Sequence, residues 1–177
     1  RYPATDEFPT GPDIGEALPS ITLSNQHGES INLDEHRDGS RAVVVFFRSV
    51  VWWPYCRTQL VELQGQLDTL RDAGIKVYGI SYDDVSDLKE FSDEYNLGYN
   101  LLSDADSAVI KEVGILNTLI EEDSEVISAA GKSFYGMPFP GVYVLDDKGL
   151  VEEKSFNRSY ATRDSAGSLL NSALGEV

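Results

Sequence analysis

The sequence predicts a single layered α/β domain, and three features carry that prediction. A continuous run of β-branched and aromatic residues, 42–47, is typical of a strand buried on both faces of a sheet. Leucines at three- and four-residue steps within 55–73 indicate an amphipathic helix, and a second apolar run, 75–81, predicts another central strand. This order favours a central, mostly parallel sheet with helices on both faces.

The N-terminal part predicts an arm followed by a β-hairpin. Residues 1–19 are rich in Pro, Gly and Thr without any period, so we expect an extended arm, at least over 1–14. Residues 21–23 and 30–33 then alternate apolar and polar on either side of a polar turn, 25–28. The pair is expected to form an N-terminal β-hairpin.

The remaining elements follow from the same two periodicities. Gly74 is expected to close the long helix, and Thr162 to cap the last one. The patterns predict further helices over 84–95, 105–113 and 163–174, and further strands over 100–102, 142–146 and 150–156. The last two of these strands should pair antiparallel across a tight turn. Because there is no repeat or linker, 1–177 is interpreted as one domain.

The charge balance excludes several partners. The chain has 30 acidic and 14 basic residues and a net charge of −16. Nucleic acids and anionic membrane surfaces both require a cationic footprint, so neither is an expected partner. The longest apolar run is six residues, far short of the roughly 20 that span a bilayer. We expect a cytoplasmic protein, with export as the open alternative because the chain starts at Arg1.

Candidate ligating residues are few. With one cysteine there is no internal disulfide, and with His27 and His36 as the only histidines no zinc site or other metal or cofactor site is expected. A catalytic pair of cysteine and histidine would require the fold to bring them together. The acidic pairs and runs at 83–84, 104–106 and 121–123 lack calcium-loop spacing and are interpreted as solvated turns and helix starts.

Cys56 is the candidate reactive residue. It lies between the buried strand and the long helix, where unpaired backbone N–H groups and the helix dipole favour a thiolate. This position, with Arg48 and Arg57 beside it, is expected to lower the thiol pKa. The alternative is that Cys56 is a small apolar residue packed under Trp52 or Trp53.

The segment around Cys56, 46–57, reads FFRSVVWWPYCR. It resembles the active-site segment of the alkyl hydroperoxide reductase/thiol-specific antioxidant (redoxin, peroxiredoxin-like) branch of the thioredoxin superfamily. Members of that branch carry Trp-Cys-Pro-Tyr-Cys here, some with selenocysteine as the first redox residue. A second segment, GMPFPG at 136–141, resembles the loop that faces the active site with a cis-proline, for which Pro140 is the candidate. The likeness covers 15–156 and implies a thioredoxin-like fold.

The resemblance implies roles for several residues. Cys56, Trp53 and Arg48 occupy the catalytic positions, with Arg48 assisting the sulfur. The substrate-binding candidates, some of which could form an aromatic lip for an apolar or peptide partner, are Trp52, Pro54, Tyr55 and Pro140.

This chain also departs from the resembled pattern at two positions. Aligned on the two-cysteine motif, Cys56 is the second cysteine and Trp53 replaces the first, so no intramolecular dithiol cycle can occur. Aligned on the peroxiredoxin motif Thr-x-x-Cys, Cys56 is the peroxide-attacking residue and Trp53 replaces the threonine. The peroxiredoxin arginine ahead of the late strand is absent, with Pro140 near its place. One hypothesis is that Trp53 stands for a cysteine or for a selenocysteine codon read as Trp.

Two functional hypotheses follow. In the first, the chain is a thiol-dependent oxidoreductase that reduces hydroperoxides or disulfides through Cys56, with turnover impaired by Trp53. An external thiol, such as a thioredoxin-like protein or glutathione, would complete its cycle, and a homodimer is left open. In the second, the fold persists as a redox-inactive binding or regulatory module in which Trp53 fills the former active site.

Overall fold

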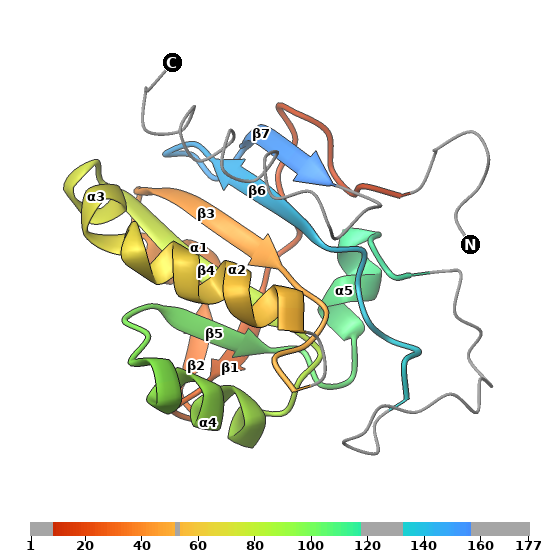
Figure 1. Ribbon diagram of the computed structural model, residues 1–177. Coiled ribbons are helices and arrows are strands. Elements are labelled where there is room, and N and C mark those ends of the chain that lie inside the picture. The colour runs from red at the N-terminus through yellow and green to blue at the C-terminus, as the bar shows by residue number, and fades with distance from the viewer. Residues whose placement is uncertain (1–8, 52–53, 118–132, 157–177) are drawn as a thin grey trace.

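A seven-stranded sheet forms the centre of the molecule in the computed structural model, which describes residues 9–51, 54–117 and 133–156. The strands are β1 (Thr22–Asn25), β2 (Ser30–Asn32), β3 (Arg41–Phe46), β4 (Ile75–Ser81), β5 (Asn100–Ser103), β6 (Gly141–Leu145) and β7 (Val151–Phe156). The helices are α1 (Leu33–Arg37), α2 (Pro54–Gly65), α3 (Leu67–Asp72), α4 (Val85–Tyr95) and α5 (Ala108–Val113). The spatial strand order is β2-β1-β5-β4-β3-β6-β7 (Figure 1).

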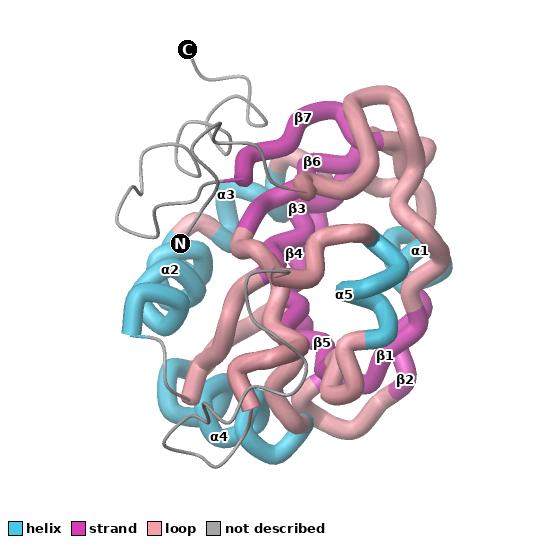
Figure 2. Tube along the Cα trace, turned by 90° about the vertical axis from the view of Figure 1, so that its right-hand side faces the viewer, coloured by secondary structure: helices cyan, strands magenta, loops and turns pink. Residues whose placement is uncertain are grey.

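The predicted α/β class with helices on both faces is confirmed. Strand β3 sends Val43 and Val45 into the core that α2, α3 and α4 cover, and Val44 and Phe46 into the core beneath α5. This division follows from the alternation of side chains along a strand, and it explains why the run at 42–47 is apolar throughout. Figure 2 shows α2 and α4 on one side of the strands and α1 and α5 on the other.

The sheet is mixed, whereas the sequence predicted one that is mostly parallel. The pairs β3–β4 and β4–β5 are parallel, and the pairs made by β1, β2, β6 and β7 are antiparallel. Two of the antiparallel pairs, β1–β2 and β6–β7, are hairpins, whose short connections can join only antiparallel neighbours. The other two, β1–β5 and β3–β6, join segments far apart in the sequence. The predicted N-terminal hairpin is confirmed, with Leu23 opposite Ile31, and so is the antiparallel pairing of β6 with β7.

Three helices differ from the sequence prediction. The helix expected over 55–73 is two helices, α2 and α3, which meet at Gly65 and Gln66, and glycine is a weak helix former. Helix α5 begins at Ala108 instead of 105 because Ser107 has a positive φ of 62°. Helix α1 was not predicted, since its five residues are too few to show a period. The helix expected over 163–174 lies outside the described residues.

The described part of the N-terminal arm runs along β6 and β7. The Gly15 N–H donates to the Val151 carbonyl at 2.8 Å, and the Tyr143 hydroxyl donates to the Thr10 carbonyl at 2.7 Å. These bonds satisfy backbone groups of residues 9–16, which form no regular strand of their own. No helix in the described residues is long and apolar enough to cross a membrane.

Candidate active site

Cys56 lies at the carboxyl end of β3, on the third residue of α2. The loop that follows β3 carries the backbone back over the helix start, so that the Arg48 N–H donates to the Cys56 sulfur at 3.4 Å. The side chain is 1% exposed and belongs to the core cluster shared with Phe47 and Leu60. The predicted strand–loop–helix placement of Cys56 is confirmed.

The structure reverses the expected shift of the thiol pKa. Burial raises the pKa of Cys56 above its ordinary value, because a thiolate loses solvation in the core. The backbone N–H groups of Ser49 and Arg48 and the positive charge of Arg48 act in the opposite direction and are outweighed. The sequence indicated the helix start correctly, but burial is the larger effect here.

The two arginines that the sequence placed beside the cysteine behave differently. Arg48 is 3% exposed, and its charge lowers the pKa of Cys56, as expected. Arg57 is turned toward α4 instead, where its guanidinium forms an ion pair with Glu94 at 3.2 Å and lies over the ring of Phe91. Of the two, the structure leaves Arg48 as the cationic candidate for the site.

A buried carboxylate, Asp83, holds the loop that precedes Cys56. It is 2% exposed and lies just beyond β4. Its carboxylate accepts hydrogen bonds from the Ser49 hydroxyl at 2.6 Å, the Val50 N–H at 2.9 Å and the Ser81 hydroxyl at 2.8 Å. The Ser103 hydroxyl donates to its backbone carbonyl at 2.6 Å. Asp83 therefore ties the loop after β3 to the ends of β4 and β5.

The sequence interpretation of the acidic runs as solvated turns and helix starts is wrong about solvation for two of their members, although one of these does lie at a helix start. Asp83 turns inward as described, and Asp104 is also buried. The Asp104 carboxylate accepts from the N–H groups of Val109 and Ile110, at 3.2 and 2.7 Å, and thereby satisfies the start of α5. The available signal for a buried Asp83 was the presence of two hydroxyl residues, Ser49 and Ser81, each at or just beyond the end of a central strand. A buried carboxylate needs such donors. The run 121–123 lies outside the described residues.

Asp83→Ala is expected to lower the free energy of unfolding by about 3–5 kcal/mol, because two hydroxyls and a backbone N–H lose their acceptor in the interior. Asp72→Ala is the matched control: Asp72 is exposed at the last residue of α3, so its loss should stay below about 1 kcal/mol. Chemical denaturation measures both values. Equal losses for the two variants would show that the Asp83 network does not stabilise the fold.

The proline loop lies at the same edge of the sheet as Cys56. Pro140 directly precedes β6, whose first residue, Gly141, pairs with Phe46 at the end of β3. The loop is anchored by bonds from the Asn117 N–H to the Met137 carbonyl, 3.0 Å, and from the Phe139 N–H to the Ile115 carbonyl, 2.7 Å.

The expected cis bond before Pro140 is not found, because no cis peptide occurs in the described residues. The Phe139–Pro140 bond is therefore trans, the isomer that most X–Pro bonds adopt. Pro54 is exposed at the first position of α2, where its missing N–H costs nothing, and Tyr55 is half-buried beside it. Trp52 and Trp53 lie outside the described residues.

The histidines are not brought to the cysteine. His36, on α1, contacts the Tyr78 hydroxyl through Nδ1, and its carbonyl accepts from Lys76 near the start of β4. Cys56 lies at the other end of the parallel strands, beyond the carboxyl end of β3. His27 is exposed in the turn between β1 and β2. Within the described ranges, no cluster of His, Cys, Asp and Glu could hold a metal ion.

The class of protein follows from these features. A mixed sheet covered by helices on both faces, with a cysteine at the start of the helix after a central strand, defines a thioredoxin-like protein of the peroxiredoxin type. The chain belongs to the AhpC/TSA family, whose model matches residues 14–154. The resemblance seen in the sequence is thereby confirmed.

Two curated relatives illustrate the match. Peroxiredoxin Q, chloroplastic, of Populus jackii is 33% identical over 138 residues, which cover 78% of this chain and 57% of that protein. The chain therefore spans just over half the length of this plant relative. Peroxiredoxin Bcp of Escherichia coli is 30% identical over 142 residues, which cover 78% of this chain and 81% of that protein.

Two solved structures share the fold at lower identity. Peroxidoxin BcpB of Mycobacterium tuberculosis superposes with a TM-score of 0.71 at 20% identity, covering 92% of this chain and 94% of that one. A 1-Cys peroxiredoxin of yeast mitochondria, described with a thiol-resolving mechanism via glutathione/thioredoxin systems, gives a TM-score of 0.73 at 15% identity. That match covers 91% of this chain and 74% of that one.

Proposed function

We propose that the chain is a thiol-dependent peroxidase in which Cys56 alone carries the redox step. The observation that carries this proposal is the position of the sole thiol, at the start of α2 with the Arg48 N–H directed at its sulfur, in a member of the AhpC/TSA family. The similarity to peroxiredoxins Q and Bcp supports a peroxidase over other uses of the fold. It makes hydroperoxides the expected substrates.

The first half of the reaction uses groups at the carboxyl edge of the sheet. The Cys56 thiolate attacks one peroxide oxygen, so that an S–O bond forms as the O–O bond breaks. Cys56 is oxidised to a sulfenic acid, and the departing oxygen takes up a proton and leaves as an alcohol or water. The Arg48 charge and the two backbone N–H groups favour the thiolate that starts this step.

The second half requires a thiol from another molecule, since no other cysteine exists in the chain. That thiol attacks the sulfenic sulfur, releases water and forms a mixed disulfide with Cys56. A second external thiol then attacks the disulfide, which frees Cys56 and leaves the reductant oxidised. A thioredoxin-like protein or glutathione has the required chemistry, and the yeast 1-Cys peroxiredoxin described with those systems supports this choice.

Peroxide is expected to oxidise Cys56 with a rate that rises about tenfold per pH unit between neutral and mildly alkaline pH, because the thiolate is the nucleophile. The folded pKa is raised, so the thiolate is scarce at neutral pH and becomes abundant only as the pH approaches that value. Loss of free thiol after a single peroxide addition measures the rate, and a sulfenic-acid trap followed by mass spectrometry locates the product. A flat profile would contradict the raised pKa. Absence of a sulfenic product on Cys56 at every pH would overturn the peroxidase proposal.

Burial of the thiol favours a second candidate, a redox-inactive binding or regulatory module. A cysteine that is 1% exposed, with a raised thiol pKa, suits a packed core residue as well as a resting nucleophile. The same experiment separates the two functions. A binding module leaves Cys56 reduced in peroxide until the protein unfolds, whereas a peroxidase is oxidised while folded.

A further inference from the structure

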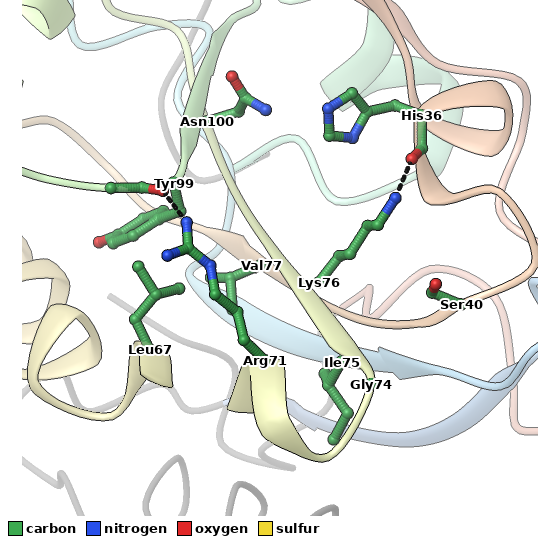
Figure 3. Close-up of a pocket in the computed structure, with 11 residues that line it drawn as sticks. His36, Ser40, Leu67, Arg71, Gly74, Ile75, Lys76, Val77, Tyr99 and Asn100 are labelled. Carbon is green, nitrogen blue, oxygen red and sulfur yellow. Dashed lines mark hydrogen bonds between the residues drawn. The ribbon is translucent and has the colours of Figure 1, made fainter. Parts of the chain in front are cut away.

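A cleft of about 380 Å³ opens at the edge of the sheet opposite Cys56. It lies between α1 and α3, over the first residues of β4 and β5 (Figure 3). The polar side chains in its lining are those of His36, Ser40, Arg71, Lys76, Tyr99 and Asn100. Because parallel strands β4 and β5 begin here and end at the Cys56 loop, this cleft is separate from the candidate active site.

The charge of this cleft is opposite to that of the whole chain. Acidic residues outnumber basic ones by 30 to 14, yet no Asp or Glu lines the cleft. Arg41 and Lys89 each form an ion pair with a carboxylate, but in the described residues neither Arg71 nor Lys76 does. Two cations in one cleft of so acidic a protein, without an ion-pair partner among residues 9–51, 54–117 and 133–156, indicate a site for an anion.

Both cations are held in position by backbone carbonyls. The Arg71 guanidinium donates to the Gly98 carbonyl at 2.6 Å, and the Lys76 ammonium donates to the His36 carbonyl at 2.6 Å (Figure 3). Arginine has five N–H donors and lysine three, so each keeps donors for a ligand. The contacts therefore fix the direction of the charges without neutralising them.

Neutral groups add further donors. Asn100 accepts from the Asn25 amide through Oδ1 at 2.9 Å, which leaves its own amide nitrogen to donate. In His36, Nδ1 contacts the Tyr78 hydroxyl, which leaves Nε2 for another contact. Partial burial and the Lys76 charge lower the pKa of His36, so the ring is neutral at pH 7 and would gain a proton beside an anion.

We propose that this cleft binds a small phosphate-type dianion through Arg71, Lys76 and Asn100, with His36 beside it. A phosphate group presents three acceptor oxygens and a charge of about −1.5 to −2, which match two fixed cations and an amide donor. The negative field of the chain repels anions at long range. Binding therefore depends on short-range contacts, and these favour a compact dianion over chloride.

His36 reports on the ligand, and His27 is an internal control. Phosphate is expected to raise the pKa of His36 by about 0.5 or more, relative to sodium chloride of equal ionic strength, because an anion nearby favours the imidazolium. His27 is exposed in the β1–β2 turn and should not change. NMR titration of the two imidazole signals measures both values. The proposal would be overturned if phosphate changed the pKa of both histidines equally, or changed the pKa of neither.

Two variants and a matched control test the cations. The phosphate-induced change at His36 should disappear in Arg71→Gln and in Lys76→Gln, each compared with its own chloride titration. Lys148→Gln, in the turn between β6 and β7, removes one charge away from the cleft and should retain the change. Persistence of the change in both cleft variants would exclude the site. Titration with glycerol phosphate completes the set: tighter binding than inorganic phosphate assigns the cleft to phosphate esters, and weaker binding to the free ion.

Discussion

Cys56→Ser is expected to reduce thiol-dependent peroxide consumption to the rate at which dithiothreitol and peroxide react without protein. The chain has one cysteine, so the variant has no thiol that could form a sulfenic acid. A serine hydroxyl is a far weaker nucleophile toward peroxide. It can still accept the hydrogen bond that the Arg48 N–H donates to the sulfur. The measurement is peroxide consumption with dithiothreitol as reductant, at equal protein concentration.

The control for this prediction is Arg57→Gln. Arg57 is the next residue along α2, and its guanidinium is turned toward α4, where it pairs with Glu94 at 3.2 Å. This variant should consume peroxide at the rate of the unchanged protein. Thermal unfolding of all three proteins shows whether each is folded at the assay temperature. Equal peroxide consumption by the Cys56→Ser variant and the unchanged protein would remove the peroxidase proposal.

The placement of Cys56 could be predicted from the sequence because it depends on neighbouring residues alone. A buried strand, a short loop and an amphipathic helix follow one another within 42–73, and their order places the cysteine at the helix start. The alternation of apolar side chains along β3 likewise required a helix layer on each face. Such local patterns predict the structure reliably where the apolar side chains that form them are buried in the core.

The sign of the cysteine pKa could not be predicted in the same way. A helix start favours a thiolate and burial opposes it, and burial depends on what the rest of the chain places over the sulfur. The same limit applies to Asp83. Its local sequence is typical of a turn, and only the folded structure shows that Ser49, Val50 and Ser81 surround its carboxylate. The antiparallel pairing of β3 with β6 joins segments about a hundred residues apart, so no local pattern reports it.

Position 53 is where the sequence departs most clearly from the resembled two-cysteine motif, and Trp53→Cys is expected to create a reversible disulfide. The change restores Cys-x-x-Cys with Cys56 as its second member, at the start of α2. In such motifs the first thiol has a lowered pKa, because the helix start favours its thiolate. That thiol would attack disulfides and peroxides, and Cys56 would resolve the product without an external thiol.

The restored cycle has a direct readout. Mild oxidation of Trp53→Cys should remove both free thiols and lower the mass of the monomer by two hydrogens, and dithiothreitol should reverse both changes. Trp53→Ser changes the same position but keeps Cys56 as the only thiol, so under the same treatment it can form only intermolecular disulfides or oxidised Cys56. A Trp53→Cys protein that keeps two free thiols would show that residues 53 and 56 do not approach within bonding distance. Formation of the disulfide would mean that one substitution lets the proposed site resolve its own sulfenic acid, so that an external thiol is needed only to reduce the disulfide. Residue 53 would then be the position that determines the type of redox cycle.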